Sequence, residues 1–150
     1  MLRKLLIGVL ALLALVIDGP VSTTNLVVRV SKPDIYTVSL SYPYIDGAER
    51  EKAWALAGGD FLKDGLWQES GSPFVFQIRI NEISSGKEIL NQQVLHPKLT
   101  SWGSGNLNAD LIRIKLESGR YQVFVQRSGN LAEAPPAELQ LQFHRAYQGK

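Results

Sequence analysis

The chain has 150 residues, with 16 Lys and Arg against 14 Asp and Glu, a formal net charge of +2, and no cysteine. This length suffices for one domain with its own core, and the missing cysteine excludes disulfides, thiol nucleophiles, cysteine metal sites and cysteine-linked lipid. The charges are scattered without a basic stripe, so binding to nucleic acid by phosphate neutralisation is not expected.

The N-terminal segment has the pattern of an export signal. Two cations precede an unbroken apolar run over residues 5–17, and a turn of Asp, Gly and Pro follows it. As a helix this run covers roughly 20 Å, short of a bilayer core of about 30 Å. We therefore expect residues 1–23 to be a signal peptide cleaved before Thr24, or an uncleaved anchor in the inner membrane. Residues 24–150 are then a single domain exported to the periplasm.

Alternating apolar residues predict that most of the exported part is β-strand. In residues 35–42, for example, Tyr36, Val38, Leu40 and Tyr42 alternate with smaller or polar side chains and form the expected core face. Glycine-rich turns or prolines separate such segments. The predicted strands cover residues 26–30, 35–42, 74–81, 88–95, 111–116, 121–125 and 139–144.

One short helix is predicted between the second and third strands. Asp46 can cap a run of good helix formers over residues 48–57, and two glycines stop it. Ala53 and Ala57 share a face with Leu56, and Trp54 lies at the edge of that face. A helix this short needs a surface to pack on, so we expect it across an edge or an open end of the sheets.

Two long segments, residues 58–73 and 98–108, are predicted to be loops. They contain Trp67 and Trp102, respectively. Exposed tryptophans are typical anchors of protein interfaces and sugar sites, but they can also close the open ends of a small β-domain. The sequence leaves both roles open.

Seven strands at this spacing with one inserted helix predict an immunoglobulin-like antiparallel β-sandwich, preceded by the N-terminal hydrophobic signal or anchor helix. The motif Leu116-x-x-Gly119-x-Tyr121 resembles the tyrosine corner of such sandwiches. In that corner the tyrosine hydroxyl bonds to the backbone a few residues upstream. This motif bears on the fold and assigns no activity.

The sequence offers no convincing catalytic set. Ser104 lacks the G-x-S-x-G pattern of a nucleophile elbow, and nothing in the spacing joins it or Ser101 to His96. His144 alternates with core residues and is expected to be structural. We therefore expect no enzyme activity, no cofactor and no metal site.

Four short motifs resemble an uncharacterised family of proteobacterial envelope proteins, over most of residues 34–150. Such small exported sandwich proteins are similar to periplasmic immunity proteins that neutralise delivered toxins, including lipases of contact-dependent secretion systems. The resemblance implies a protein partner and no activity, and the chain lacks the lipid-bearing cysteine of many immunity proteins. The motifs are Ala55-Leu56-Ala57-Gly58-Gly59, His96-Pro97-x-Leu99-x-Ser101-Trp102-Gly103, Leu116-x-x-Gly119-x-Tyr121 and Arg145-Ala146-Tyr147-x-Gly149-Lys150.

These observations favour a periplasmic protein-binding domain, with an immunity-type role against a secreted antibacterial toxin as its specific form. The predicted binding residues are Trp67, His96, Ser101 and Trp102. The alternative is a non-catalytic module that binds a carbohydrate or another small ligand on Trp67 or Trp102. A hydrolase using His96 with Ser101 or Ser104 is the least favoured hypothesis. Membrane contact is expected only through the N-terminal segment.

Overall fold

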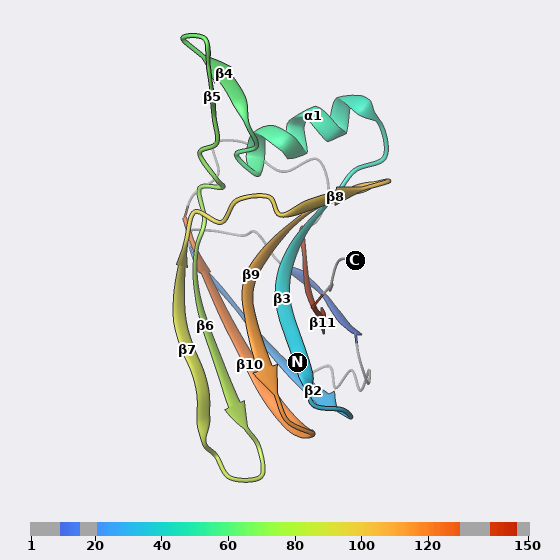
Figure 1. Ribbon diagram of the computed structural model, residues 1–150, viewed down its shortest axis with the longest axis vertical. Coiled ribbons are helices and arrows are strands. Elements are labelled where there is room, and N and C mark those ends of the chain that lie inside the picture. The colour runs from blue at the N-terminus through green and yellow to red at the C-terminus, as the bar shows by residue number, and fades with distance from the viewer. Residues whose placement is uncertain (1–9, 16–20, 130–138, 147–150) are drawn as a thin grey trace.

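Two antiparallel sheets face each other in the computed structural model, which describes residues 10–15, 21–129 and 139–146 (Figure 1). The first sheet has the order β1-β11-β3-β9-β8 and the second has the order β2-β10-β6-β7. The first sheet consists of β1 (Leu10–Leu15), β11 (Leu139–Arg145), β3 (Asp34–Pro43), β9 (Asn106–Leu116) and β8 (Ser101–Gly103). The second consists of β2 (Val21–Val30), β10 (Gly119–Ser128), β6 (Val75–Glu82) and β7 (Glu88–Leu95). A separate hairpin pairs β4 (Phe61–Lys63) with β5 (Leu66–Gln68), and α1 covers Gly47–Leu56.

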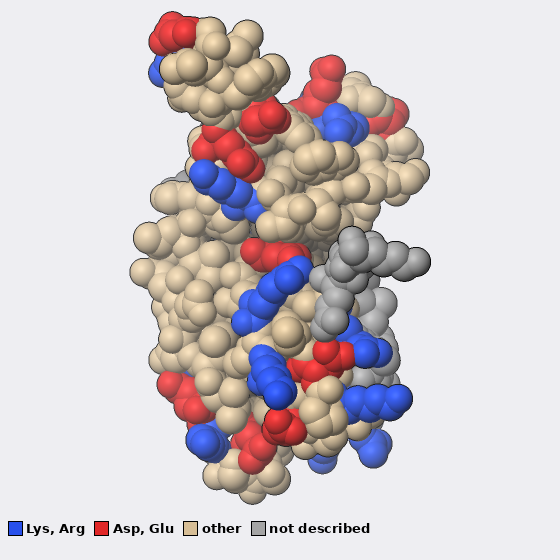
Figure 2. Space-filling model, in the orientation of Figure 1, with Lys and Arg blue, Asp and Glu red and all other residues tan. Residues whose placement is uncertain are grey.

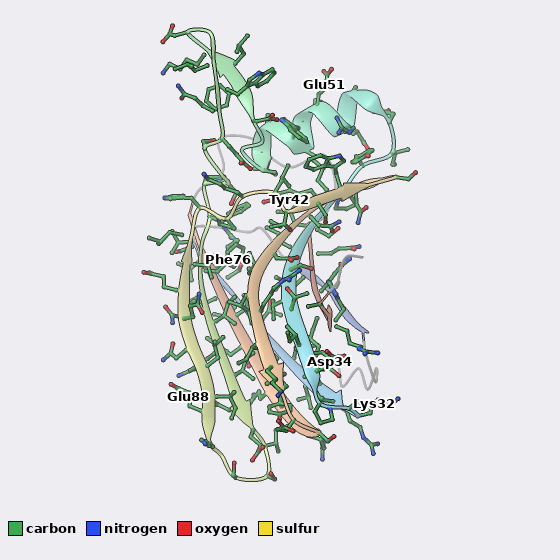
Figure 3. All side chains as sticks on the ribbon, in the orientation of Figure 1. Lys32, Asp34, Tyr42, Glu51, Phe76 and Glu88 are labelled. Atoms are coloured by element: carbon green, nitrogen blue, oxygen red, sulfur yellow. The ribbon has the colours of Figure 1, made fainter. Side chains whose placement is uncertain are left out.

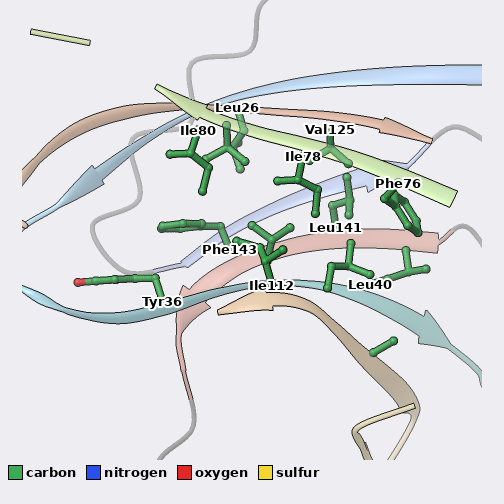
Figure 4. Packing of buried hydrophobic residues seen from close by; sticks show 14 of the residues in the cluster. Leu26, Tyr36, Leu40, Phe76, Ile78, Ile80, Ile112, Val125, Leu141 and Phe143 are labelled. Carbon is green, nitrogen blue, oxygen red and sulfur yellow. The ribbon is translucent and has the colours of Figure 1, made fainter. Parts of the chain in front are cut away.

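The core lies between the two sheets and takes apolar side chains from both (Figure 4). On β3 the predicted face is confirmed, because all four of its alternating core residues are buried. On β6 the side chains of Phe76, Ile78 and Ile80 are completely buried opposite them. The period-2 alternation of the sequence therefore selects the side of β3 and of β6 that faces the core.

All seven predicted strands are confirmed as β2, β3, β6, β7, β9, β10 and β11. Their order, however, departs from the immunoglobulin arrangement, in which the first strand joins the sheet of the second and fifth strands. Here the first of the seven, β2, pairs with β10, and the last, β11, pairs with β3. The two terminal strands have thus exchanged sheets relative to that arrangement. Pairing partners of this kind depend on contacts distant in sequence, which the alternation pattern does not contain.

The predicted tyrosine corner is confirmed. The Tyr121 hydroxyl donates a hydrogen bond of 2.8 Å to the carbonyl of Glu117, four residues upstream. A second bond of the same kind lies at the start of β3, where the Tyr36 hydroxyl donates to the carbonyl of Lys32 at 2.9 Å. Each tyrosine is the third residue of its strand. The two bonds fasten the entry of one strand in each sheet.

The N-terminal apolar segment differs from the expected helix where the structure describes it. Leu10–Leu15 forms strand β1, which pairs antiparallel with β11. The edge of β11 offers backbone N–H and C=O groups that need partners, and an extended apolar segment provides them. The rest of the predicted run, residues 5–9, 16 and 17, lies outside the described residues, and the predicted boundary before Thr24 falls within β2. No helix among the described residues is long and apolar enough to cross a membrane.

The predicted helix is confirmed and lies across one end of the two sheets (Figure 1). The Asp46 side chain accepts a hydrogen bond from the backbone N–H of Glu49 at 2.8 Å, and the Glu49 carboxylate accepts one from the Ile45 N–H at 2.7 Å. These bonds satisfy donors at the start of the helix that have no partner within it. Figure 3 shows Tyr42 beneath α1, while Glu51 points away from the sheets.

Candidate functional site

Large apolar side chains are exposed at the end of the molecule that carries α1. Trp67 is 71% exposed and Trp102 is 61% exposed. We call this surface the aromatic end and define it as Trp54 of α1, Trp102 of β8, and Phe61, Leu62, Leu66 and Trp67 of the β4–β5 hairpin. Exposed large apolar side chains grouped at one end of a protein are typical of an interaction site.

The β4–β5 hairpin replaces part of the loop predicted over residues 58–73. Its two-residue turn is Asp64-Gly65, and both residues have positive φ angles, 53° and 75°. An Asp-Gly pair between apolar residues is a strong hairpin signal, which sequence reasoning missed at this position. All six strand residues of the hairpin are exposed. Figure 2 shows the hairpin projecting from the body of the molecule, with charged groups near its tip.

Trp54 connects the helix to both other parts of the aromatic end. Its ring meets the ring of Trp102 edge-on, with centroids 5.8 Å apart, and the Arg50 guanidinium lies 5.3 Å from the ring centroid. The Trp54 indole N–H donates to the carbonyl of Asp60 at 3.1 Å, just before the hairpin. A Cβ at Gly59 would lie 2.3 Å from the Trp54 ring, so only glycine fits there without movement. The backbone at Gly59 and Asp60 thus packs directly against the Trp54 indole.

A cavity of about 510 Å³ separates α1 from the base of the hairpin. Its lining includes Arg50, Trp54 and Phe61. The cavity offers a partner a recess with an aromatic wall and a cation beside it. Apolar recesses with a few polar groups are the usual form of binding sites.

The exposures exclude one of the two roles left open for the loop tryptophans, that of closing the end of the sandwich. Trp67 and Trp102 do not close the end of the sandwich, because most of each side chain faces solvent. Closure at this end comes instead from α1 and its C-cap residue: Ala53 of the helix and Ala57 at the cap are buried in the core, and Trp54 packs against it.

His96 does not join the serines proposed as its catalytic partners. It is exposed, has a φ of 46°, and its ring Nδ1 lies 3.0 Å from the carbonyl oxygen of Ser72. No hydrogen bond links it to Ser101 or Ser104 among the described residues. His96 therefore fastens the segment after β7 to the segment before β6, and the proposed set of His96 with either serine is not assembled.

Ser101 and Trp102, adjacent in sequence, belong to different surfaces. Ser101 pairs with Asn108 and Trp102 pairs with Leu107 in the β8–β9 ladder. Directly paired residues share a face, and neighbours along a strand point to opposite faces. Leu107 is buried, so Trp102 lies on the inner side, at the aromatic end, while Ser101 lies on the outer face of the first sheet.

The outer face of the first sheet carries a polar cavity of about 440 Å³. Its position follows from β3, a strand between two others, whose outward residues are the small Thr37, Ser39 and Ser41. Longer polar side chains stand on both sides of them, on β9 and β11. We call this the polar groove and define it by its lining residues Ser39, Thr100, Ser101, Asn106, Asn108, Asp110, Arg113, Gln142 and His144.

A β-bulge shapes one wall of the groove. Val38 pairs with Ile112 while Ser39 pairs with Asp110, so Leu111 is an extra residue in β9. Because of it, Asp110 and Arg113, three positions apart, both line the groove, and their side chains approach to 3.5 Å. Without the bulge the alternation of the strand would separate them. Figure 2 shows acidic and basic groups close together over this part of the surface, with no large area of one sign.

The floor of the groove contains a serine–histidine pair that sequence reasoning missed. The Oγ of Ser39 lies 3.2 Å from Nε2 of His144, and Nδ1 of His144 lies 2.8 Å from the carbonyl oxygen of Arg145. A carbonyl can only accept, so Nδ1 carries the proton of the neutral ring and the Ser39 hydroxyl donates to Nε2. Ser39 is in a regular strand and 1% exposed, unlike a nucleophile raised on a turn. The pair is 105 positions apart, and no local signal could have found it.

Comparison with known proteins identifies the family. Residues 20–145 match the family described as Domain of unknown function (DUF5625). The chain belongs to the DUF5625 family. An uncharacterised family was expected from the sequence motifs, and this expectation is confirmed. No protein of curated function matches the chain.

Solved structures support the fold. The crystal structure of a Sulfurospirillum deleyianum protein is similar, with a TM-score of 0.70 and 13% identity, over 93% of this chain and 98% of that one. At this identity the likeness shows the shared fold alone. A β-glucosidase from Paenibacillus barengoltzii matches with a TM-score of 0.31 and 14% identity, over 93% of this chain and 11% of that one, which is too low to carry an argument.

Proposed function

We propose that this DUF5625 protein is a non-catalytic, protein-binding domain of the cell envelope that engages its partner through the aromatic end. The observation that carries this proposal is the grouping of exposed apolar side chains on the β4–β5 hairpin and β8, beside Trp54. Tryptophan is enriched among the residues that dominate binding energy at protein interfaces. The envelope location rests on the sequence alone, in which two cations before an apolar run are typical of an export signal. In the structure, Leu10–Leu15 of this run is strand β1.

The hairpin itself favours a protein partner. A two-stranded hairpin is marginal in water by itself, and this one has strands of only three residues. Leu62 and Trp67 pair on one of its faces, while Phe61 and Leu66 belong to the other. A partner covering either face would bury apolar surface and order the hairpin, which stabilises the complex. Occlusion of a toxin by this end, as an immunity-type protein would do it, is the specific form of the proposal.

The proposal is tested by quantitative capture of the partner from envelope extract. The bait is the full chain, compared with Trp67→Ala and Trp102→Ala. Ile83→Ala is the matched control, because Ile83 is also an exposed apolar residue but lies in the turn after β6, at the opposite end of the sandwich. Loss of an interface anchor costs about 2 kcal/mol or more, so each tryptophan variant should weaken the captured complex by at least roughly 30-fold.

A partner that binds wild type and Ile83→Ala equally, and both tryptophan variants much less, supports the aromatic end as the interface. Equal binding by all four proteins contradicts it. For the immunity-type form, wild type should protect cells from the captured partner delivered to the periplasm, and Trp67→Ala should protect less. Envelope location is tested separately by cell fractionation of the full chain.

A further inference from the structure

The polar groove, on the outer face of the first sheet, is a cavity distinct from the aromatic end. Its volume of about 440 Å³ lies within the range of roughly 300–1,000 Å³ that is typical of small-molecule sites. The outward residues of β3 are small, whereas their neighbours on β9 and β11 are long, so β3 forms the floor of the groove and the other two strands form its walls. The groove therefore has the size and shape of a small-ligand site.

The hydrogen-bonding groups of the groove are divided between those already paired and those facing the cavity. The Ser39 hydroxyl is already paired with His144 and is 1% exposed, so it forms the floor of the groove and is not a main ligand contact. Asn108 accepts from the Asn106 amide at 3.2 Å through its oxygen, so its NH₂ group remains a donor. The Gln142 amide has no hydrogen-bond partner among the described residues and presents both a donor and an acceptor. The lining thus presents both donors and acceptors to the cavity.

The charges of the groove favour neither an anionic nor a cationic ligand. Asp110, its one carboxylate, lies 3.5 Å from the Arg113 guanidinium. An ion attracted by one member of this pair is repelled by the other, so the pair provides no net attraction for a charged ligand. The remaining lining residues are amides, hydroxyls and an imidazole, which serve a ligand through hydrogen bonds.

From these observations we propose that the polar groove binds a neutral, polyhydroxylated ligand, a mono- or disaccharide, using Gln142 and Asn108 as its main hydrogen-bonding residues. Each hydroxyl of a sugar both donates and accepts, which suits a lining that offers both donors and acceptors. This site is independent of the proposed protein interface, and it differs from a sugar site on Trp67 or Trp102.

The test is NMR titration of the ¹⁵N-labelled full chain with maltose and with N,N′-diacetylchitobiose, and glucuronic acid as the anionic probe. A neutral disaccharide should shift the amide signals of β3, β9 and β11 that surround the groove. Gln142→Ala and Asn108→Ala should each weaken this binding by roughly three- to tenfold, the effect of losing one hydrogen bond to a neutral group. Gln140→Ala is the matched control, because Gln140 is on the same strand and face as Gln142 but does not line the cavity.

Binding that is reduced in Gln142→Ala and retained in Gln140→Ala supports the proposal. It is overturned if neither disaccharide shifts the groove signals at millimolar concentration, if only glucuronic acid does, or if both glutamine variants bind as wild type does. Trp102→Ala separates this inference from the protein interface. If that variant abolishes saccharide binding while Gln142→Ala does not, the sugar binds at the aromatic end and the groove proposal is wrong.

Discussion

Replacing the buried Tyr36 or Tyr121 by phenylalanine should lower the free energy of unfolding. Replacing the buried Tyr42 by phenylalanine should leave it unchanged or raise it. The hydroxyls of Tyr36 and Tyr121 each donate a hydrogen bond to a backbone carbonyl. The hydroxyl of Tyr42 is also buried, and its neighbour is the buried hydroxyl of Ser72, but the two do not meet hydrogen-bond geometry, and neither has another partner among the described residues. The three substitutions remove the same atom from the same residue type, so they isolate the contribution of the hydrogen bond.

The expected magnitudes follow from the surroundings of each hydroxyl. The carbonyls released by Tyr36→Phe and Tyr121→Phe belong to the exposed residues Lys32 and Glu117, where water can replace the lost donor. Each variant should therefore lose only the net value of a hydrogen bond, about 1 kcal/mol of unfolding free energy. Tyr42→Phe removes a buried hydroxyl that pays for its desolvation without a bond, so the free energy of unfolding should stay unchanged or rise by up to roughly 1 kcal/mol.

The assay is chemical denaturation of wild type and the three variants at pH 7, together with thermal unfolding. A loss of about 1 kcal/mol corresponds to a fall in Tm of roughly 4 °C in a domain of this size. The slope of the denaturation curve should be the same in all four proteins, which shows that only stability has changed. A loss of more than about 1 kcal/mol in Tyr42→Phe, or no loss in Tyr121→Phe, would refute the reasoning.

Three further predictions concern the cap, the helix end and pH. Asp46→Ala should lower the free energy of unfolding by about 1 kcal/mol, because the N–H of Glu49 loses its acceptor; denaturation measures this, and an unchanged midpoint contradicts the role of the cap. Gly59→Ala should displace the ring of Trp54 and shift the tryptophan emission to the red, whereas Gly47→Ala, with no atom within 4 Å of the new Cβ, should leave the spectrum unchanged. Burial raises the pKa of the three tyrosines above 10 in the folded state. Their contribution to stability is therefore complete below pH 10 and is lost as the pH rises further. Denaturation at pH 9 and above should show this decline, and flat stability through pH 11 would contradict it.

The local elements of this protein could be predicted from its sequence because their causes are local. The alternation of Tyr36, Val38 and Leu40 places one side of β3 in the core, whatever strand lies beside it. The helix cap needs Asp46 and Glu49, three residues apart, and the tyrosine corner needs Tyr121 and a carbonyl four residues upstream. The Asp64-Gly65 hairpin was equally local, and its signal was present but not used.

The sequence did not place residues whose surroundings come from segments far apart in the chain. His96 could not be placed from its neighbours, because its ring contact, Ser72, comes from a segment 24 residues away. The sequence grouped Ser101 with Trp102, yet the strand that contains them directs one to the polar groove and the other to the aromatic end. The sequence showed the tryptophans of the aromatic end but not their exposure, because both loop tryptophans could equally have been buried.

The sequence alone therefore determined the mainly β class, seven of the strands, the capped helix and the corner at Tyr121, since each depends on spacings of a few residues. Tertiary structure decided which strands are neighbours, that the apolar segment Leu10–Leu15 pairs with β11, and that Ser39 meets His144. The physical reason is the same in each case. A pairing between strands far apart in the chain is chosen by the free energy of the whole sheet, and no single segment carries that information.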